Sequence, residues 1–262
     1  MGIILLLIAI IPVMLLGWYI YHKDRNKEPT PLLIGFFFLG IAAAIVTLAI
    51  SFGIDKFVPI IRVDTNSLDP LSLFIHVFIF VALIEELSKW IFAYFVGYNN
   101  KEFDEMYDMI VYAVFIALGF ACIENIVYVF AESSISVGIY RGLLAVPGHT
   151  CFGIFMGYYL SMAKFYNTLG YNKMENINKA KSILVPVILH GIYDYCCMIN
   201  SGLFILAFFV FVICLYIFAH GKLKYTAGIV SKVGNTTNNK YCPKCGSIVT
   251  GNFCTQCGCK QQ

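Results

Sequence analysis

Two adjacent carboxylates and a lysine form the first group of residues in this sequence with the potential for chemistry. Glu85, Glu86 and Lys89 lie in the run EELSK, and spacings of three and four residues place both carboxylates within reach of the lysine on a helix. One lysine neutralises only one carboxylate, so the other requires a histidine, a metal ion or a proton as its partner. A carboxylate held in this way suits the role of general base toward water.

Two histidines and three further polar residues occur in later apolar segments. Glu124 and Asn125 are adjacent in an apolar run, and His149 follows a Pro-Gly pair. His190 and Asp194 are four residues apart and therefore share a helix face. Each of these residues alone is explained by packing or by a hydrogen bond between helices. Their joint occurrence favours chemistry.

The composition indicates that membrane-spanning helices position these residues. The 262 residues are 60% hydrophobic and 13% charged, which is about half the charged fraction of ordinary soluble domains. This excludes a soluble globular enzyme and a disordered chain, and the net charge of +3 is too small to indicate a nucleic-acid partner. We therefore expect an all-α, polytopic transmembrane helical bundle.

About seven segments have the roughly 20 predominantly apolar residues that a helix needs to cross a lipid bilayer. The first resembles a retained signal anchor, because it has no basic N-terminal region and is followed directly by lysine and arginine. The predicted spans are about 2–21, 31–54, 71–96, 109–131, 140–163, 183–199 and 203–220.

The distribution of basic residues predicts the orientation of these spans. The connections on one side and the C-terminal tail together contain fourteen Lys and Arg residues, whereas the other side contains only Lys56, Arg62 and Arg141. Because cytoplasmic segments are the basic ones, we expect a multi-pass protein of the plasma membrane. Its N-terminus would be external and its C-terminus cytoplasmic.

This arrangement brings the polar residues to one level in the membrane. Counted inward from the external ends of their spans, the four residues Glu85, Glu124, His149 and His190 lie about seven to fourteen residues deep. An ionisable group near the centre of a bilayer costs roughly 3 kcal/mol, so several of them at one depth are hard to explain by packing. The sequence therefore predicts a buried hydrophilic cavity with a function.

The C-terminal tail is predicted to be a separate module. A polar linker over 226–239 separates the membrane-embedded domain, residues 1–225, from a cysteine-rich segment at 240–262. Two CxxC pairs, each followed by glycine, favour a cytoplasmic zinc ribbon with one structural Zn²⁺. Disulfides are the alternative, which a reducing cytoplasm disfavours. The predicted zinc ligands are Cys242, Cys245, Cys254 and Cys257.

Four motifs occur in order over roughly residues 80–200. They are EExxK from Glu85, ALGFACIENIVY at 117–128, PGHTCFGIFMGYYLSMAK at 147–164 and HxxYD from His190. This series resembles the PrsW family of intramembrane proteases, and the acidic residues at 104, 105 and 108 also look like that family's pattern. The family is distantly similar to the CAAX-protease and bacteriocin-processing group, whose first motif ends in arginine one residue later.

The resemblance implies roles for the polar residues. Glu85 would be the general base, and His149 would hold the water or exchange its proton. His190 would donate to the oxyanion of the tetrahedral intermediate. Glu86, paired with Lys89, would provide electrostatic support.

Three supporting residues are less clearly assigned by the resemblance. Glu124 and Asn125 match a family motif whose chemical role is less defined. The last motif often ends in asparagine, whereas this chain has Asp194. Because an ionised carboxylate repels an oxyanion, Asp194 must be protonated, orient His190 or help to hold a metal ion.

An active-site metal stays open at this point. Two histidines and two or three carboxylates form an adequate ligand set for Zn²⁺, although the HExxH motif is absent. We favour metal-free activation of water by Glu85 and His149.

The resulting prediction is an intramembrane endopeptidase that cleaves a single-pass membrane protein near the external face of the bilayer. Members of the resembled family make the first extracytoplasmic cut in a membrane-anchored anti-sigma factor, so the resemblance implies a substrate of that class. Two other functions suit the same features. Buried acids occur in transporters and proton relays, and a membrane protein with a zinc ribbon suits a non-catalytic scaffold.

Overall fold

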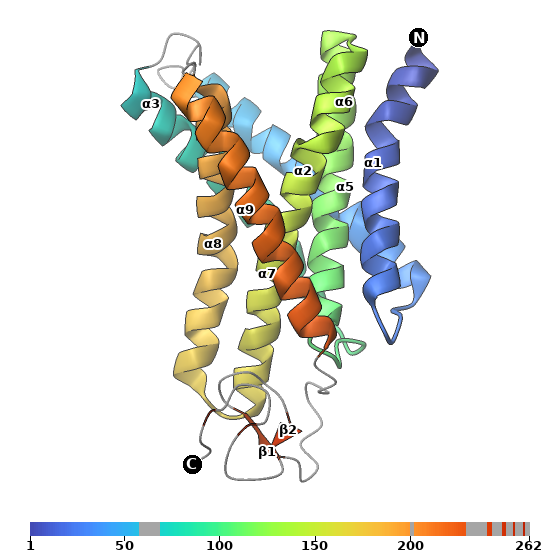
Figure 1. The fold of residues 1–262 in the computed structure, drawn as a ribbon, viewed down its shortest axis with the longest axis vertical. Helices are drawn as coiled ribbons and strands as arrows, with labels where there is room; N and C mark the ends of the chain where they lie inside the picture. Colours follow the sequence, from blue (N-terminus) through green and yellow to red (C-terminus); the bar gives the residue numbers. More distant parts are fainter. Residues whose placement is uncertain are drawn as a thin grey trace.

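The chain folds into a bundle of long helices (Figure 1). The structure is a computed structural model, and it describes residues 1–57, 69–199, 202–228, 240–242, 248–249, 254 and 259. Two short antiparallel strands, β1 (Lys240–Tyr241) and β2 (Ile248–Val249), lie in the tail. The helices are α1 (Gly2–Lys23), α2 (Thr30–Phe57), α3 (Pro70–Ile75), α4 (Leu83–Phe92), α5 (Asp108–Glu132), α6 (Ile135–Leu143), α7 (Ala145–Thr168), α8 (Asn172–Met198) and α9 (Gly202–Ala227).

Six helical segments in the described part of the chain are long and apolar enough to cross a bilayer. They are Gly2–Lys23, Thr30–Ile54, Pro70–Gly97, Asp108–Glu132, Ile135–Thr168 and Gly202–Ala227. This confirms the predicted transmembrane helical bundle and makes the chain a multi-pass membrane protein. The seventh predicted span, 183–199, lies in α8, whose first half is rich in lysine. That α8 also crosses the bilayer stays a prediction.

Helices α5 and α7 form the centre of the bundle. They pack against each other, and α5 also packs against α1 and α2, while α8 packs along α7 (Figure 1). Two glycines allow the closest approach, which is between α2 and α5. A Cβ atom built on Gly40 would lie 2.0 Å from the carbonyl oxygen of Ile116, and one on Gly119 would lie 1.9 Å from that of Phe37. Only glycine permits this backbone contact.

Replacing Gly119 by alanine is expected to destabilise the folded protein. The added methyl group overlaps the backbone of α2, so the two helices must separate, at a cost of about 1–3 kcal/mol. Thermal unfolding in detergent micelles measures the loss. Gly35→Ala in α2 is the matched control, because nothing lies within 4 Å of a Cβ atom at that position. Equal melting temperatures for the two variants would contradict the predicted contact.

The helix that contains Glu85 and Glu86 is part of one continuous segment, Pro70–Gly97. Within it, π-helical stretches at His76–Ala82 and Ala93–Gly97 flank α4 on both sides. Asp69 caps the start by accepting hydrogen bonds from the N–H groups of Leu71 and Ser72. The ends of the segment Pro70–Gly97 agree with the predicted span 71–96. The wide π turns, which are frequent near functional sites, have no signal in the sequence.

The predicted span 140–163 is divided in the structure. Helix α6 ends at Leu143, Leu144 has φ −121° and ψ −58°, and α7 begins at Ala145. Pro147 therefore lies in the first turn of α7, where its missing N–H is tolerated. The break separates α6, at the same end of the bundle as the N-terminus, from α7, which contains His149 (Figure 1).

Part of the cysteine-rich tail is described. Cys242 and Cys254 are buried together, with Tyr225 and Cys259 packed against them. The other two predicted zinc ligands, Cys245 and Cys257, lie outside the described residues. The zinc ribbon and the domain boundaries at 225 and 239 stay predictions.

Buried carboxylates gather where α1 ends and α5 begins. Asp24, Glu28 and Asp108 are all buried there, and Tyr112 donates a 2.9 Å hydrogen bond to Glu28. Burial raises the pKa of Asp24 to about 6, and the nearby Glu105 carboxylate acts in the same direction. Burial also raises the pKa of Glu28 to about 7. Both groups therefore bind their protons more tightly in the folded protein than in the unfolded chain.

We expect this end of the bundle to make the protein less stable as the pH rises. The stability that the bound protons contribute is fully present below the ordinary pKa values of 3.8 and 4.5. It is lost as the pH rises through about 6 and about 7. From pH 5 to pH 8 the melting temperature should fall by about 2–4 °C for each 1 kcal/mol lost. Asp24→Asn with Glu28→Gln should flatten that dependence, and Glu132→Gln, at an exposed acid, should leave it unchanged.

Candidate active site

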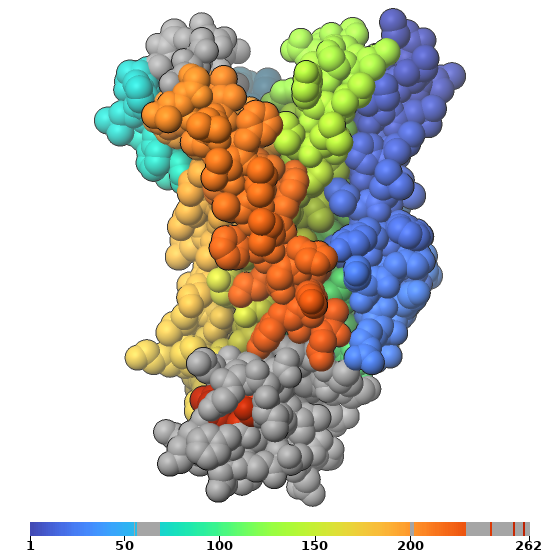
Figure 2. Space-filling model, viewed as in Figure 1, coloured from blue at the N-terminus to red at the C-terminus, as the bar shows by residue number. Residues whose placement is uncertain are grey.

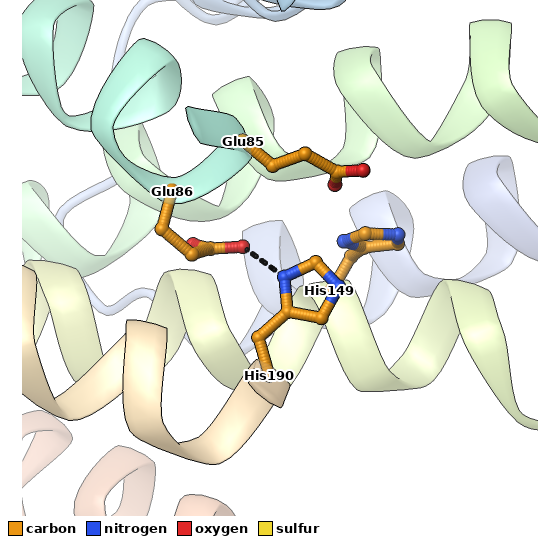
Figure 3. Close-up of side chains that lie close together, drawn as sticks. All are labelled: Glu85, Glu86, His149 and His190. Atoms are coloured by element: carbon orange, nitrogen blue, oxygen red, sulfur yellow. Dashed lines mark hydrogen bonds and ion pairs between the residues drawn. The ribbon is translucent and has the colours of Figure 1, made fainter. Parts of the chain in front are cut away.

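Four buried side chains from three helices converge inside the bundle (Figure 3). Glu85 and Glu86 come from α4, His149 from α7 and His190 from α8. One potential ligand atom from each lies within 4.8 Å of those from the other three. The predicted catalytic residues therefore lie together, as the depth of each in its span indicates.

Lys89 lies against three of these four residues. Its Nζ atom is 2.7 Å from Glu86 Oε1, 3.5 Å from Glu85 Oε2 and 3.2 Å from His149 Nδ1. The same ammonium lies 3.9 Å from the ring centroid of Phe120, an arrangement that stabilises a buried cation. Lys89 thus contacts both carboxylates and pairs more closely with Glu86.

The two adjacent glutamates have different environments. Glu86 has no exposed surface, and its Oε1 atom also contacts His190 Nδ1 at 2.9 Å. Its Oε2 atom has no hydrogen-bond partner among the described residues. Glu85 instead borders a cavity. Of the pair, Glu85 is the carboxylate that a substrate or a water molecule can reach.

Each histidine lies between two polar partners. The Lys89 ammonium only donates, so Nδ1 of His149 accepts, and Nε2–H of His149 donates to Glu124 Oε2 at 2.7 Å. This hydrogen-bond pattern fixes one tautomer. For His190, Nδ1 faces Glu86 and Nε2 lies 3.2 Å from Asp194 Oδ2. Asp194 is therefore placed to orient His190, one of the three roles considered for it.

Arg141 belongs to the site, although its sequence position predicted only a basic residue in an external connection. Its Nη2 atom lies 3.2 Å from Glu124 Oε2, and its Nε–H donates to Asn125 Oδ1 at 3.2 Å. The guanidinium also stacks 4.0 Å from the ring centroid of Tyr128. Asn125 points away from the four-residue cluster and donates to the Ala9 carbonyl of α1. No spacing rule links Arg141 to Glu124, because the contact depends on how α6 folds back on α5.

A cavity of about 550 Å³ lies beside the cluster. Its lining includes Glu85, Glu124, His149, His190 and Asp194, together with residues of α6 and α9. Figure 2 shows the surface hollowed between α6 and α9 at the end of the molecule where the N-terminus lies. The site is thus buried in the bundle and has room for a substrate beside it.

The profile of the PrsW family of intramembrane metalloproteases matches residues 28–219. The chain belongs to the PrsW family. It is 35% identical over 248 residues to Protease PrsW of Clostridioides difficile, covering 90% of this chain and 98% of that protein. It is 38% identical over 216 residues to Protease PrsW of Oceanobacillus iheyensis, covering 82% and 93% of the two chains. No solved structure matches it.

Membership of the PrsW family makes the chain an intramembrane protease, which acts on a protein substrate within a lipid bilayer. This confirms the predicted enzyme class. The family's description as metalloproteases strengthens the metal alternative that the sequence left open, relative to metal-free activation of water.

The residues at the PrsW site fit a metal ion. Two imidazoles and two carboxylates are suitable ligands for Zn²⁺, and Glu85, Glu86, His149 and His190 are the described residues that meet this requirement. The unpartnered Glu86 Oε2 is one available ligand atom. Lys89 contacts three of the same residues, so a metal ion and the ammonium would compete for these ligands.

Proposed function

We propose that this PrsW protein is an endopeptidase that hydrolyses a peptide bond of a single-pass membrane protein near the external face of the plasma membrane. Its catalytic residues would be Glu85, Glu86, His149 and His190. The observation that supports this most directly is their convergence at a 550 Å³ cavity. Glu85, His149 and His190 line that cavity, and Glu86 lies buried behind them.

Glu85 is proposed as the general base. It borders the cavity, and its contact with Lys89 is the longer of the two ion pairs that this lysine makes. The carboxylate would accept a proton from a water molecule as the water oxygen attacks the scissile carbonyl carbon. The same proton would then pass to the leaving amine as the peptide C–N bond breaks.

His149 and its partners are proposed to position the attacking water, for which Nδ1 of His149 would exchange its contact with the Lys89 ammonium for one with the water. Lys89 and Glu124 hold the ring in one tautomer through contacts of 3.2 and 2.7 Å. Arg141 in turn holds Glu124 at 3.2 Å. Glu124, Asn125 and Arg141 are therefore positioning residues rather than reacting groups.

His190 is proposed to donate a hydrogen bond to the oxyanion. Its Nε2 atom faces the cavity side, where Asp194 lies 3.2 Å away. Asp194 would orient the ring in the resting enzyme, and the developing oxyanion would replace it as the acceptor. This role is the one that the resemblance in the sequence implies, and the preorganised position of the ring supports it.

We further propose that His149, His190 and Glu86 would hold a divalent metal ion such as Zn²⁺. The metal would polarise the water or the scissile carbonyl. Glu85 would remain free to act as the base, because it is the carboxylate of the pair that borders the cavity. Lys89 would continue to neutralise the acids from within α4.

The substrate and the orientation are also proposals. The end of the bundle where α6 lies would face outward, because the basic connections occur at the other end. The substrate would be an anti-sigma-factor-like protein whose chain is unwound next to the bilayer. The tail, with Cys242, Cys245, Cys254 and Cys257, would form a cytoplasmic zinc ribbon.

Co-expression of a tagged anti-sigma factor with the protease tests this function. Wild type is expected to release a fragment of defined size, and Glu85→Ala is expected to release none while accumulating in the membrane at the wild-type level. Release by Glu85→Ala would overturn the mechanism. No release by the wild type would overturn the substrate class. A truncation after Ala227 shows whether the tail is required for cleavage.

A further inference from the structure

A second, smaller cavity meets the active-site cavity from the side of α2. It has a volume of about 210 Å³ and lies between α2, the π-helical segment His76–Ala82 and α5. We name it the α2–α5 chamber. Four residues line both cavities: Val81, Glu85, Glu124 and Tyr128. The proposed base therefore lies at the junction of two spaces.

The wall that α2 contributes to the chamber is small and partly polar. Ala44, Thr47, Leu48 and Ser51 line it, and their spacing of three and four residues places them on one face of the helix. The neighbouring positions Ile45 and Phe52 are exposed on the outer surface of the bundle. On the face of α2 toward Glu85, Ala44 and Thr47 are buried, whereas Leu48 is 54% exposed and lies at the outer edge of the chamber.

Thr47 has an unsatisfied hydroxyl at this wall. In apolar helices a threonine hydroxyl commonly bonds the carbonyl four residues earlier, as Thr150 does with Val146 and Thr226 with Lys222. Thr47 is only 8% exposed, and its Oγ1 atom has no hydrogen-bond partner within the described ranges. A buried hydroxyl without a partner is unfavourable. Because this oxygen atom is itself buried, a group in the chamber reaches it only when the Thr47 side chain rotates.

An unwound peptide is a ligand that suits these features. Because Glu85 must face the scissile bond, the chain on one side of that bond can occupy the 550 Å³ cavity and the other side the chamber. Phe80, Phe120 and Ile123 provide apolar contacts for a side chain. Thr47 can bond a backbone group that the substrate frees when it leaves its helix. The carboxylates of Glu85 and Glu124 disfavour an acidic side chain at the same place.

The size of the chamber limits the side chain that it accepts. A cavity of about 150 Å³ lined by apolar residues can hold a benzene molecule. The chamber, at about 210 Å³, thus has room for one leucine or phenylalanine side chain.

We propose that the α2–α5 chamber is the subsite that receives one large apolar side chain of the substrate next to the scissile bond. This rests on the proposed peptidase function of Glu85. Ala44 limits the depth of the subsite, since it is buried against Phe120 and Ile123. Thr47, after rotation of its side chain, binds the substrate backbone there.

A change of substrate preference tests the proposal. The probe is the anti-sigma factor described above, after mass spectrometry has located its cleaved bond, with each flanking residue replaced in turn by Ala, Leu, Phe or Asp. At one flanking position, wild type should prefer Leu or Phe over Ala and reject Asp. Ala44→Leu should reverse the Leu-to-Ala preference by about 10-fold or more in kcat/KM. Thr47→Val should lower cleavage of the whole series in equal proportion, by about 10-fold.

The controls distinguish a change at the subsite from a folding defect and from a failure of the proposed peptidase function. Ala49→Leu makes the same change at an exposed position of α2 and should leave the preference unchanged. Ser51→Leu narrows the chamber from another side, and it replaces Ala44→Leu if that variant does not accumulate. Cleavage that requires Glu85 but shows no altered preference in either chamber variant would overturn the subsite. No cleavage by wild type would instead overturn the proposed anti-sigma-factor-like substrate class.

Discussion

Glu85→Gln is expected to lower peptide cleavage by about 1,000-fold or more while leaving the folded protein intact. Glutamine keeps the size of the side chain but cannot accept the proton from water, and loss of general base catalysis alone removes a factor of about 10²–10⁴. The remaining ion pair of Lys89 is the 2.7 Å contact with Glu86, so the ammonium stays neutralised. Cleavage of the tagged substrate in proteoliposomes, beside thermal unfolding of the same preparation, measures both effects.

Two further variants make this expectation specific. Glu86→Gln should lower both activity and melting temperature, because Glu86 is fully buried and contacts both Lys89 and His190. Glu175→Gln changes another buried glutamate, which pairs with Lys179 at the other end of α8, and should keep full activity. If Glu85→Gln retains more than about one tenth of wild-type cleavage, Glu85 is not the base.

Lys89→Met should cause the largest loss of stability of any substitution at the site. It removes the cation from Glu85 and Glu86, and an uncompensated buried charge costs about 3–5 kcal/mol. The cation–π contact with Phe120 is lost as well. We expect the variant to melt about 10 °C below wild type in detergent or to fail to accumulate.

A second substitution tests the reason for this loss. In Lys89→Met with Glu86→Gln, the unpaired charge next to the methionine is removed, so part of the lost stability should return. Lys164→Met is the matched control, since this half-buried lysine donates to the Tyr98 carbonyl and contacts no carboxylate at ion-pair distance within the described chain. If the double variant is no more stable than Lys89→Met, packing rather than charge explains the effect.

The convergence of the site could be predicted because membrane depth is a strong constraint. Glu85, His149 and His190 lie on different helices, and counting residues from the same face of the bilayer places them at one level before any contact is known. Hydropathy alone also located the first four helical segments to within two residues of their ends, whereas the segments Ile135–Thr168 and Gly202–Ala227 extend five to seven residues beyond the predicted spans at one or both ends.

What depth does not determine is the direction in which each side chain points. Glu124 and Asn125 are adjacent, so they point about 100° apart on a helix; one contacts His149 and the other contacts the Ala9 carbonyl of α1. The contact of Arg141 with Glu124 depends on how α6 folds back on α5 through the turn at Ser133 and Ser134, which no spacing rule predicts. The α2–α5 chamber likewise depends on a close helix packing that no single motif encodes.

The position of Lys89 within α4 has a consequence for biosynthesis. Its closest carboxylate, Glu86, lies three residues away on the same helix. By contrast, His149 follows Lys89 by 60 residues in the sequence, and His190 follows Glu86 by 104 residues. When this segment enters the bilayer, neither histidine has yet been synthesised, and a single unpaired charge there costs roughly 3 kcal/mol. Because Lys89 and Glu86 neutralise each other within α4, the lysine lowers the cost of inserting this helix into the membrane before the active site has formed.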